Sequence, residues 1–124
     1  MTKEGRPLSP HLTIYRWPIT MTLSILHRMT GVALAAGFVA FTSWLAAVAF
    51  EGVPYDWVHE ITQSVIGQIA LFGWLFSFFL HLSNGIRHLV WDTGRFFEKR
   101  QADRSAWIVV IATVVMTTSY WFVV

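Results

Sequence analysis

The stretch that decides the fold is residues 61–86, ITQSVIGQIALFGWLFSFFLHLSNGI, which contain no Asp, Glu, Lys or Arg. A bilayer core about 30 Å thick needs roughly 20 helical residues to cross it, so a run of this length can span a membrane. Two further runs without ionised side chains cover residues 29–50 and 105–124. Lipid permits only helices and closed barrels, and barrel strands are about half as long as these runs. We therefore predict an all-α membrane protein with three antiparallel transmembrane helices, at about 21–50, 61–91 and 105–124.

The composition excludes several other classes of protein. Of the 124 residues, 55% are hydrophobic and 13% are charged, whereas soluble domains carry about 25% charged residues. The mean hydropathy is +0.52, so neither a disordered chain nor a soluble domain is expected. Cysteine is absent, which excludes disulfides, Cys-ligated iron–sulfur clusters and thiolate nucleophiles. The length allows one domain, and we predict a single transmembrane domain over residues 1–124.

The charged residues predict the orientation in the membrane. Residues 1–20 form a proline-rich N-terminal arm on the basic side, without the apolar core of a signal peptide. The loop at residues 51–60 carries only acidic charges, whereas the segment after the second span is basic. The positive-inside rule then places the N-terminus inside and the C-terminus outside. The net charge of +2 is thus a topology signal, and we expect no nucleic-acid partner.

A first polar cluster lies at the inner end of the first span. Ser24, His27 and Arg28 are spaced i, i+3 and i+4, so they share one helix face, and Gly31 continues that face without bulk. A hydroxyl, an imidazole and a guanidinium together can hold a carbonyl or a propionate at the membrane edge. The alternative is that Arg28 reaches to lipid headgroups and Ser24 bonds back to its own helix.

A second polar cluster lies at the inner end of the second span. His81 and His88 are seven residues apart and face the same way, and His81 lies about 16 Å of helical rise before Asp92. Imidazole is a common axial ligand of haem iron, so His81 is a candidate ligand. The alternative is a buried histidine bonded to a neighbouring helix. His88 is a weaker candidate ligand, which could bind a haem propionate or pair with Asp92. Ser77, Asn84, Gly85 and Asp92 lie on or near the same face as the two histidines, so we expect a polar stripe on this helix. Gly85 would leave a gap beside His81 for a flat ligand.

Together these segments resemble the cytochrome b556 membrane-anchor subunits of succinate dehydrogenase, the succinate:quinone oxidoreductase of respiratory complex II. The resemblance covers the whole chain in length, spans and motifs. The matching motifs are residues 6–12 (RPLSPHL), residues 24–31 (SILHRMTG), His81, residues 85–88 (GIRH) and residues 91–94 (WDTG).

The resemblance implies roles that the residues alone do not. His81 matches the axial ligand of haem b, with the other axial histidine coming from a second small anchor subunit, so that the two chains form a heterodimeric haem b bundle. Ser24 and Arg28 match residues of the ubiquinone site. The further partners would be an iron–sulfur subunit and a flavoprotein with FAD, at a bacterial inner (cytoplasmic) membrane or, for a processed chain, the mitochondrial inner membrane. Residues matching positions near the haem propionates or supporting them are His27, His88, Arg87 and Asp92.

Three alternatives to a succinate-oxidising anchor stay open at this point. The same fold serves quinol:fumarate reductases, and quinone potential rather than sequence decides the direction. A haem-free structural anchor would tether a soluble complex without using His81. A small transporter or channel subunit would need polar residues through more than one helix, and the third span offers only hydroxyl residues near its end.

Overall fold

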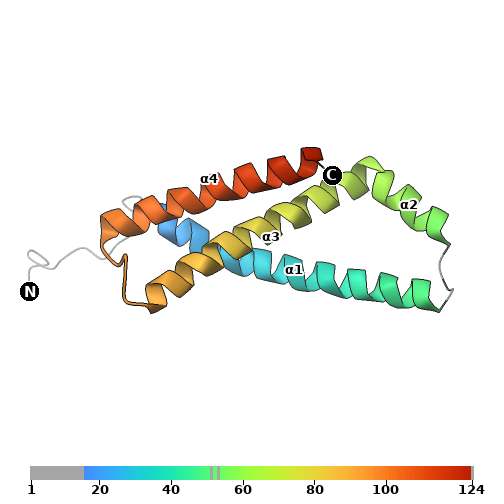
Figure 1. The fold of residues 1–124 in the computed structure, drawn as a ribbon, viewed down its shortest axis with the longest axis horizontal. Coiled ribbons are helices and arrows are strands. Elements are labelled where there is room, and N and C mark those ends of the chain that lie inside the picture. The colour runs from blue at the N-terminus through green and yellow to red at the C-terminus, as the bar shows by residue number, and fades with distance from the viewer. Residues whose placement is uncertain (1–15, 51, 53, 124) are drawn as a thin grey trace, which may run out of the picture.

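The computed structural model describes residues 16–50, 52 and 54–123 and is helical (Figure 1). The elements are α1 (Ile19–Ala49), α2 (Tyr55–Gln63), α3 (Val65–Asp92) and α4 (Lys99–Val123). Three of them, α1, α3 and α4, are long and apolar enough to cross a membrane. They run in alternating directions, which confirms the predicted all-α, three-span architecture.

The start of α1 is set by a proline. Pro18 precedes the helix in extended backbone, and its carbonyl accepts from the amides of Met21 and Thr22 at 3.1 and 3.2 Å. Proline has no amide proton and cannot donate a hydrogen bond inside a helix, so it is tolerated at the start of a helix and disfavours a helix that runs through it. The helix therefore begins two residues earlier than position 21, where the sequence placed it. The matched motif at residues 6–12, with His11, lies outside the described residues.

The second predicted span differs from the structure at its beginning. Sequence analysis placed a loop at 51–60 and a continuous helix from 61, but Tyr55–Gln63 form a separate short helix that ends at Ser64. The Ser64 hydroxyl accepts from the amide of Gly67 at 3.0 Å, as an N-cap does. Gln68 Nε2 also donates to the Thr62 carbonyl at 2.9 Å. These bonds satisfy backbone groups on both sides of the break, so the spanning helix α3 starts at Val65.

The turn between α3 and α4 reverses the chain within a few residues. Thr93 ends α3, and Gly94 adopts φ +80°, a left-handed conformation that favours glycine. The reversal brings α4 back along α3, with the basic residues of the connection at one end of the bundle (Figure 1). The basic residues of this end are Arg95, Lys99, Arg100 and Arg104.

The packed core of the chain is small for a protein of this length. The buried hydrophobic residues among those described are Leu23, Leu80, Ala106 and Val109, contributed by α1, α3 and α4. None of the most apolar part of α1 is buried. The large apolar side chains that remain exposed belong in lipid or against partner helices, since a soluble monomer rarely exposes such continuous surfaces.

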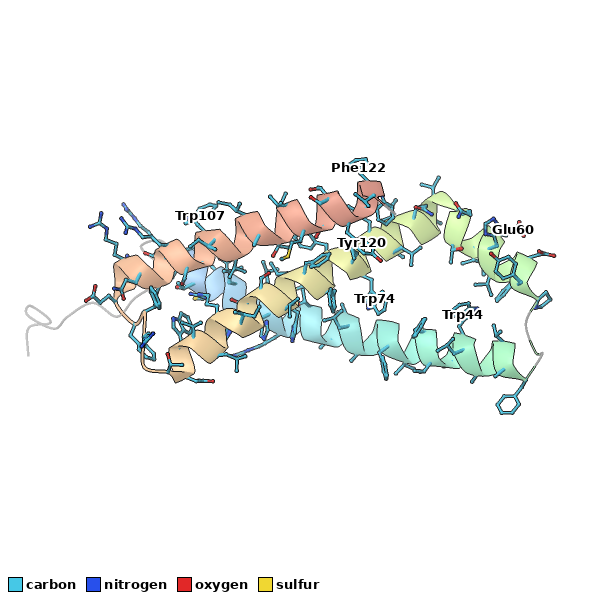
Figure 2. All side chains as sticks on the ribbon, viewed as in Figure 1. Trp44, Glu60, Trp74, Trp107, Tyr120 and Phe122 are labelled. Atoms are coloured by element: carbon cyan, nitrogen blue, oxygen red, sulfur yellow. The ribbon has the colours of Figure 1, made fainter. Side chains whose placement is uncertain are left out.

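α1 and α3 approach at one end and separate toward α2. An apolar cleft of about 1000 Å³ lies between these three helices and is lined by Gly37 on α1, Tyr55 on α2 and Gly73 on α3, among others. Trp44 and Trp74 point into it (Figure 2). The cleft begins at Ser77, which lies one helical turn from His81. The lining of the cleft includes none of His27, His81 and His88, so this apolar space ends about one turn of α3 away from His81.

Candidate functional site: a histidine stack between α1 and α3

Three imidazoles meet where α1 and α3 pack. The ring of His27, from α1, lies 3.9 Å from the ring of His81, from α3, with an interplanar angle of 12°. The ring of His88, two turns further along α3, lies 5.2 Å from His27 at 25°. The structure therefore joins the histidines of the two polar clusters that the sequence indicated separately.

The hydrogen bonds of His81 determine which of its nitrogens is free. Its Nδ1 lies 3.1 Å from the backbone oxygen of His27 and 3.2 Å from Thr30 Oγ1. A carbonyl oxygen only accepts, so we assign the proton to Nδ1. Nε2 then carries the lone pair, and the hydrogen bonds of His81 to the described residues involve Nδ1 alone. A histidine that ligates a metal typically has this arrangement, with its other ring nitrogen donating to a carbonyl.

The closeness of α1 to His81 depends on a glycine. A Cβ added at Gly31 would lie 3.2 Å from His81 Cε1, tighter than ordinary van der Waals contact. At Gly85, where the sequence suggested the gap, an added Cβ meets nothing within 4 Å. The glycine that makes room for the imidazole is therefore Gly31 on the neighbouring helix, and Gly85 leaves open surface on α3.

His88 and His27 differ in how their nitrogens are satisfied. His88 Nδ1 donates to the Asn84 carbonyl of its own helix at 2.8 Å. The suggested pairing of His88 with Asp92 is not observed within the described residues, where the only ion pair joins Lys99 and Asp103. His27 Nδ1 is buried and has no hydrogen-bond partner among them. An unpaired polar atom at this place suits a polar group supplied from outside the chain, such as a propionate.

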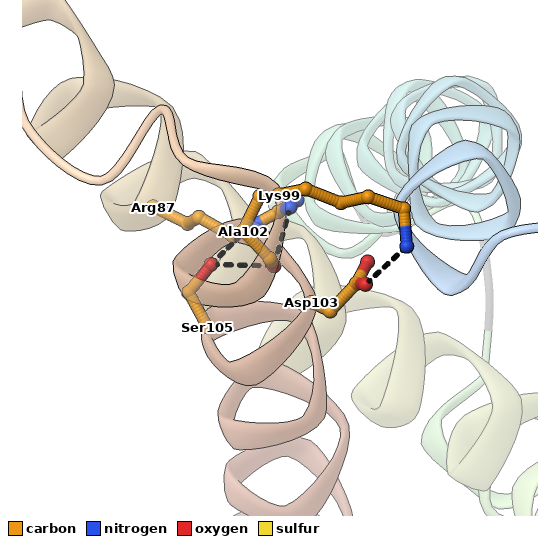
Figure 3. A network of polar contacts seen from close by, with 5 residues as sticks. All are labelled: Arg87, Lys99, Ala102, Asp103 and Ser105. Carbon is orange, nitrogen blue, oxygen red and sulfur yellow. Dashed lines mark hydrogen bonds and ion pairs between the residues drawn. The ribbon is translucent and has the colours of Figure 1, made fainter.

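Arg87 faces α4 and lies away from the histidine stack. It is 6% exposed, and its Nε donates to Ser105 Oγ at 2.9 Å and its Nη2 to the Ala102 carbonyl at 3.2 Å (Figure 3). Its Nη1 donates to Asn84 Oδ1 at 3.2 Å, and its guanidinium lies 4.0 Å from the centre of the Trp91 ring. Arg87 thus joins α3 to α4.

The residues of the polar stripe expected on α3 differ in the helices that they contact. Asn84 is fully buried, and its side chain accepts from Arg87, which faces α4. The rings of His81 and His88 instead stack with His27 of α1. Residues three apart on a helix are offset by only about 60°, so Asn84 lies beside the histidines on α3, and the positions of α1 and α4 decide which partner each side chain contacts. For Arg87, the geometry favours a supporting role over direct contact with a haem propionate.

Ser24 and Arg28 remain available to a ligand. Ser24 is half-buried and Arg28 is exposed, and neither makes a hydrogen bond or ion pair with the described part of the chain. The alternative in which Ser24 bonds back to its own helix is therefore not observed. Asp92 is exposed at the end of α3, close to the basic connection.

The donor set fits a haem iron better than an isolated metal ion. Among residues 16–50, 52 and 54–123, no group of three or more His, Cys, Asp or Glu could hold a metal ion. A haem iron needs only axial ligands from protein, because the porphyrin supplies the other four nitrogens. The free Nε2 of His81 is suited to be one such ligand, and the partnerless Nδ1 of His27 lies beside it for a further polar group.

Comparison with known proteins agrees with this geometry. The family of succinate dehydrogenase/fumarate reductase transmembrane subunits matches residues 2–119. The succinate dehydrogenase cytochrome b556 subunit of Rickettsia bellii is 42% identical over 116 residues, which cover 94% of this chain and 90% of that protein. The corresponding subunit of Paracoccus denitrificans is 37% identical over 116 residues, or 94% and 89%. The mitochondrial cytochrome b560 subunit of Sus scrofa is 41% identical over 115 residues, or 90% and 67%.

The fold is that of a multi-pass membrane protein, and the relatives named above are b-type cytochrome subunits. The chain belongs to the family of succinate dehydrogenase/fumarate reductase transmembrane subunits. Its function is that of a cytochrome b membrane anchor of succinate dehydrogenase, which confirms the resemblance read from the motifs and implies haem b as cofactor.

Sequence reasoning missed one polar residue of the site, Thr30. Its hydroxyl contacts His81, although it belongs to the quoted motif at residues 24–31. The signal was its spacing, because Thr30 follows His27 by three residues and so lies close to it on the helix surface.

Proposed function

We propose that this chain supplies one axial ligand of a haem b, His81, and part of a ubiquinone site, in addition to anchoring the enzyme in the membrane. The observation that carries the proposal is the bond from His81 Nδ1 to the His27 carbonyl, which leaves Nε2 free to coordinate iron. Haem b, when bound, supplies one-electron redox chemistry. His27 and His88 border the site and are suited to hydrogen-bond the propionates, with Arg87 and Asp92 as supporting residues.

The second axial ligand comes from another chain in this proposal. His81 lies in a unit of three spanning helices with a small core, and the exposed apolar faces of these helices need partners. A second small anchor subunit would cover them and complete a heterodimeric bundle, as in bundles that place cofactors between facing helices. The haem is then shared between the two subunits.

The ubiquinone site is proposed at the N-terminal end of α1. The Ser24 hydroxyl is free to donate to a quinone oxygen, and Arg28 places a positive charge one turn further. Charge of that sign stabilises the anionic intermediates of quinone reduction. Succinate oxidation belongs to partner subunits, a flavoprotein with FAD and an iron–sulfur protein, and this chain positions the acceptor.

The proposed orientation places that site on the inner face of the membrane. The basic connection between α3 and α4 and the start of α1 lie at the same end of the bundle (Figure 1), as the positive-inside rule requires for the inner side. The soluble subunits would dock there, on a bacterial inner (cytoplasmic) membrane or the mitochondrial inner membrane. The N-terminus is inside and the C-terminus outside in this arrangement.

The test is a reduced-minus-oxidised optical spectrum of the detergent-purified complex, with subunit content checked by gel. Native complex is compared with His81→Ala and with His59→Ala, an exposed histidine of α2 that serves as control. We expect a b-type band in native and His59→Ala complexes, and its loss or shift in assembled His81→Ala complex. An unchanged band in His81→Ala would refute the ligand assignment, and no band in intact native complex would favour a haem-free anchor.

A further inference from the structure

Thr30 is a buried hydroxyl placed between the two helices that carry the histidines. Its Oγ1 lies 2.9 Å from the Leu26 carbonyl and 3.0 Å from the His27 carbonyl, one turn earlier in α1. The same oxygen lies 3.2 Å from His81 Nδ1 on α3. Thr30 is 7% exposed, so water does not compete freely for these contacts.

Proton accounting assigns a direction to each of these bonds. The Thr30 hydroxyl has one proton, and both carbonyls only accept, so the hydroxyl donates to Leu26 or His27. Its lone pairs are then turned to His81, whose Nδ1 carries the imidazole proton. That N–H is shared between the His27 carbonyl and the Thr30 hydroxyl, a three-centre bond to two acceptors from α1.

A second threonine in the same helix shows what is special about this position. Thr42 donates to the Phe38 and Val39 carbonyls at 2.9 and 3.0 Å, the same pattern of back-bonds as Thr30. Thr42 is exposed, and no hydrogen bond from its hydroxyl to another helix is found in the described structure. Back-bonding alone therefore does not account for the contact of Thr30 with His81.

We propose that Thr30 is a positioning residue for His81, which orients the imidazole and increases the electron donation of Nε2 to a bound haem iron. The proposal rests on the proposed role of His81 as axial ligand. Acceptors on the far nitrogen of a ligating histidine fix its tautomer and raise its basicity. A stronger donor stabilises ferric iron more than ferrous iron, so the Thr30 hydroxyl lowers the midpoint potential of the haem. Gly31 complements it by leaving space beside His81 Cε1.

The experiment uses the whole purified complex and four variants of this chain. Thr30→Val removes the hydroxyl at similar volume, Thr30→Ala removes it without a methyl against the ring, and Thr30→Ser retains it. Thr42→Val is the matched control, because it removes the same back-bonds away from His81. The readouts are haem content per complex, a redox titration of the b-type band and the electron paramagnetic resonance spectrum of the ferric haem.

We expect Thr30→Val and Thr30→Ala to shift the midpoint potential upward and to change the ferric spectrum, with Thr30→Ser and Thr42→Val close to native. If the two hydroxyl-free variants keep the native potential and spectrum at full haem content, the positioning role is refuted. A shift of equal size in Thr42→Val would also refute it. The His81→Ala variant is measured in parallel. A b-type band retained in that variant would refute His81 as the ligand, which is a different result from loss of the positioning role of Thr30. If Thr30→Val does not assemble, Thr30→Ala alone decides.

Discussion

Replacing Arg87 with methionine tests how α4 is held to α3. The guanidinium donates two hydrogen bonds to α4 and one to Asn84 of its own helix, and it lies over the Trp91 ring. Methionine preserves much of the stem's volume but can make none of these bonds. We expect Arg87→Met to destabilise the packing of α4 and leave the histidine stack in place.

The size of the expected stability loss depends on which polar groups lose their hydrogen-bond partners in Arg87→Met. Ser105 keeps its bond to the Ala102 carbonyl at 2.9 Å, so neither is stranded. Asn84 is fully buried, its Nδ2 already lacks a described partner, and its Oδ1 would lose Arg87. A stranded buried acceptor costs about 1–3 kcal/mol, and a partly desolvated cation–π contact contributes about 0.5–2 kcal/mol. Release from the cost of burying a charge offsets part of this, which leaves a net loss of roughly 1–3 kcal/mol.

The assay is the heat-induced loss of the b-type band in detergent-purified complex, combined with protease sensitivity of the α3–α4 connection. The control is Lys99→Met, because Lys99 lies at the same end of α4 but is 90% exposed and, within the described residues, pairs only with Asp103, four residues on (Figure 3). Such surface pairs contribute little to stability. Arg87→Met should lower the midpoint temperature clearly, and Lys99→Met should not.

A second variant distinguishes the network from general loss of packing. Asn84→Leu alone leaves the Arg87 guanidinium short of one acceptor, and we expect it to destabilise as well. In the double variant both partners are apolar, so the combined loss should be smaller than the sum of the single losses. Additive losses, or equal effects of Arg87→Met and Lys99→Met, would refute the reasoning.

Three further predictions concern α1 and the break before α3. Gly31→Ala places a carbon 3.2 Å from His81 Cε1 and should reduce haem content in the optical spectrum, whereas Gly73→Ala, with nothing within 4 Å in this chain, should not. Arg28→Leu should impair quinone reduction and leave succinate oxidation by a soluble artificial acceptor largely intact; equal loss of both would indicate failed assembly. Ser64→Ala removes the N-cap of α3 and should lower the stability of the complex by about 1 kcal/mol in thermal unfolding. Ser83→Ala is the control, because it removes a serine inside α3 that caps no helix; equal effects of the two variants would contradict the capping role.

Much of the fold was predictable because the membrane removes alternatives. A run of about 20 apolar residues has to satisfy its own backbone groups in lipid, so length and lack of charge suffice to predict a spanning helix. The short helix α2 was missed because its residues read as a polar loop, and Ser64 lies inside an otherwise uncharged run. The Ser64 side chain, a preferred N-cap residue, was the signal in the sequence that a new helix could start there.

The candidate site was predictable in its residues but not in its contacts. His27, His81 and His88 could be selected because polar side chains are costly at membrane depth. Their meeting in one stack depends on where α1 crosses α3, which no local pattern specifies. The separation of Asn84 and Arg87 from the histidines likewise depends on where α4 packs.

The amino-acid sequence by itself determined the membrane class, the number of spans and the side-chain chemistry at the inner ends of the helices. Those properties depend on apolar length and charge, which act residue by residue against the bilayer. Only the tertiary structure decided that Nε2 of His81 is the free nitrogen, that the His27 carbonyl and the Thr30 hydroxyl accept from its Nδ1–H, and that Arg87 joins α3 to α4. Hydrogen bonds between helices need distances near 3 Å, and those distances are set by how whole helices pack.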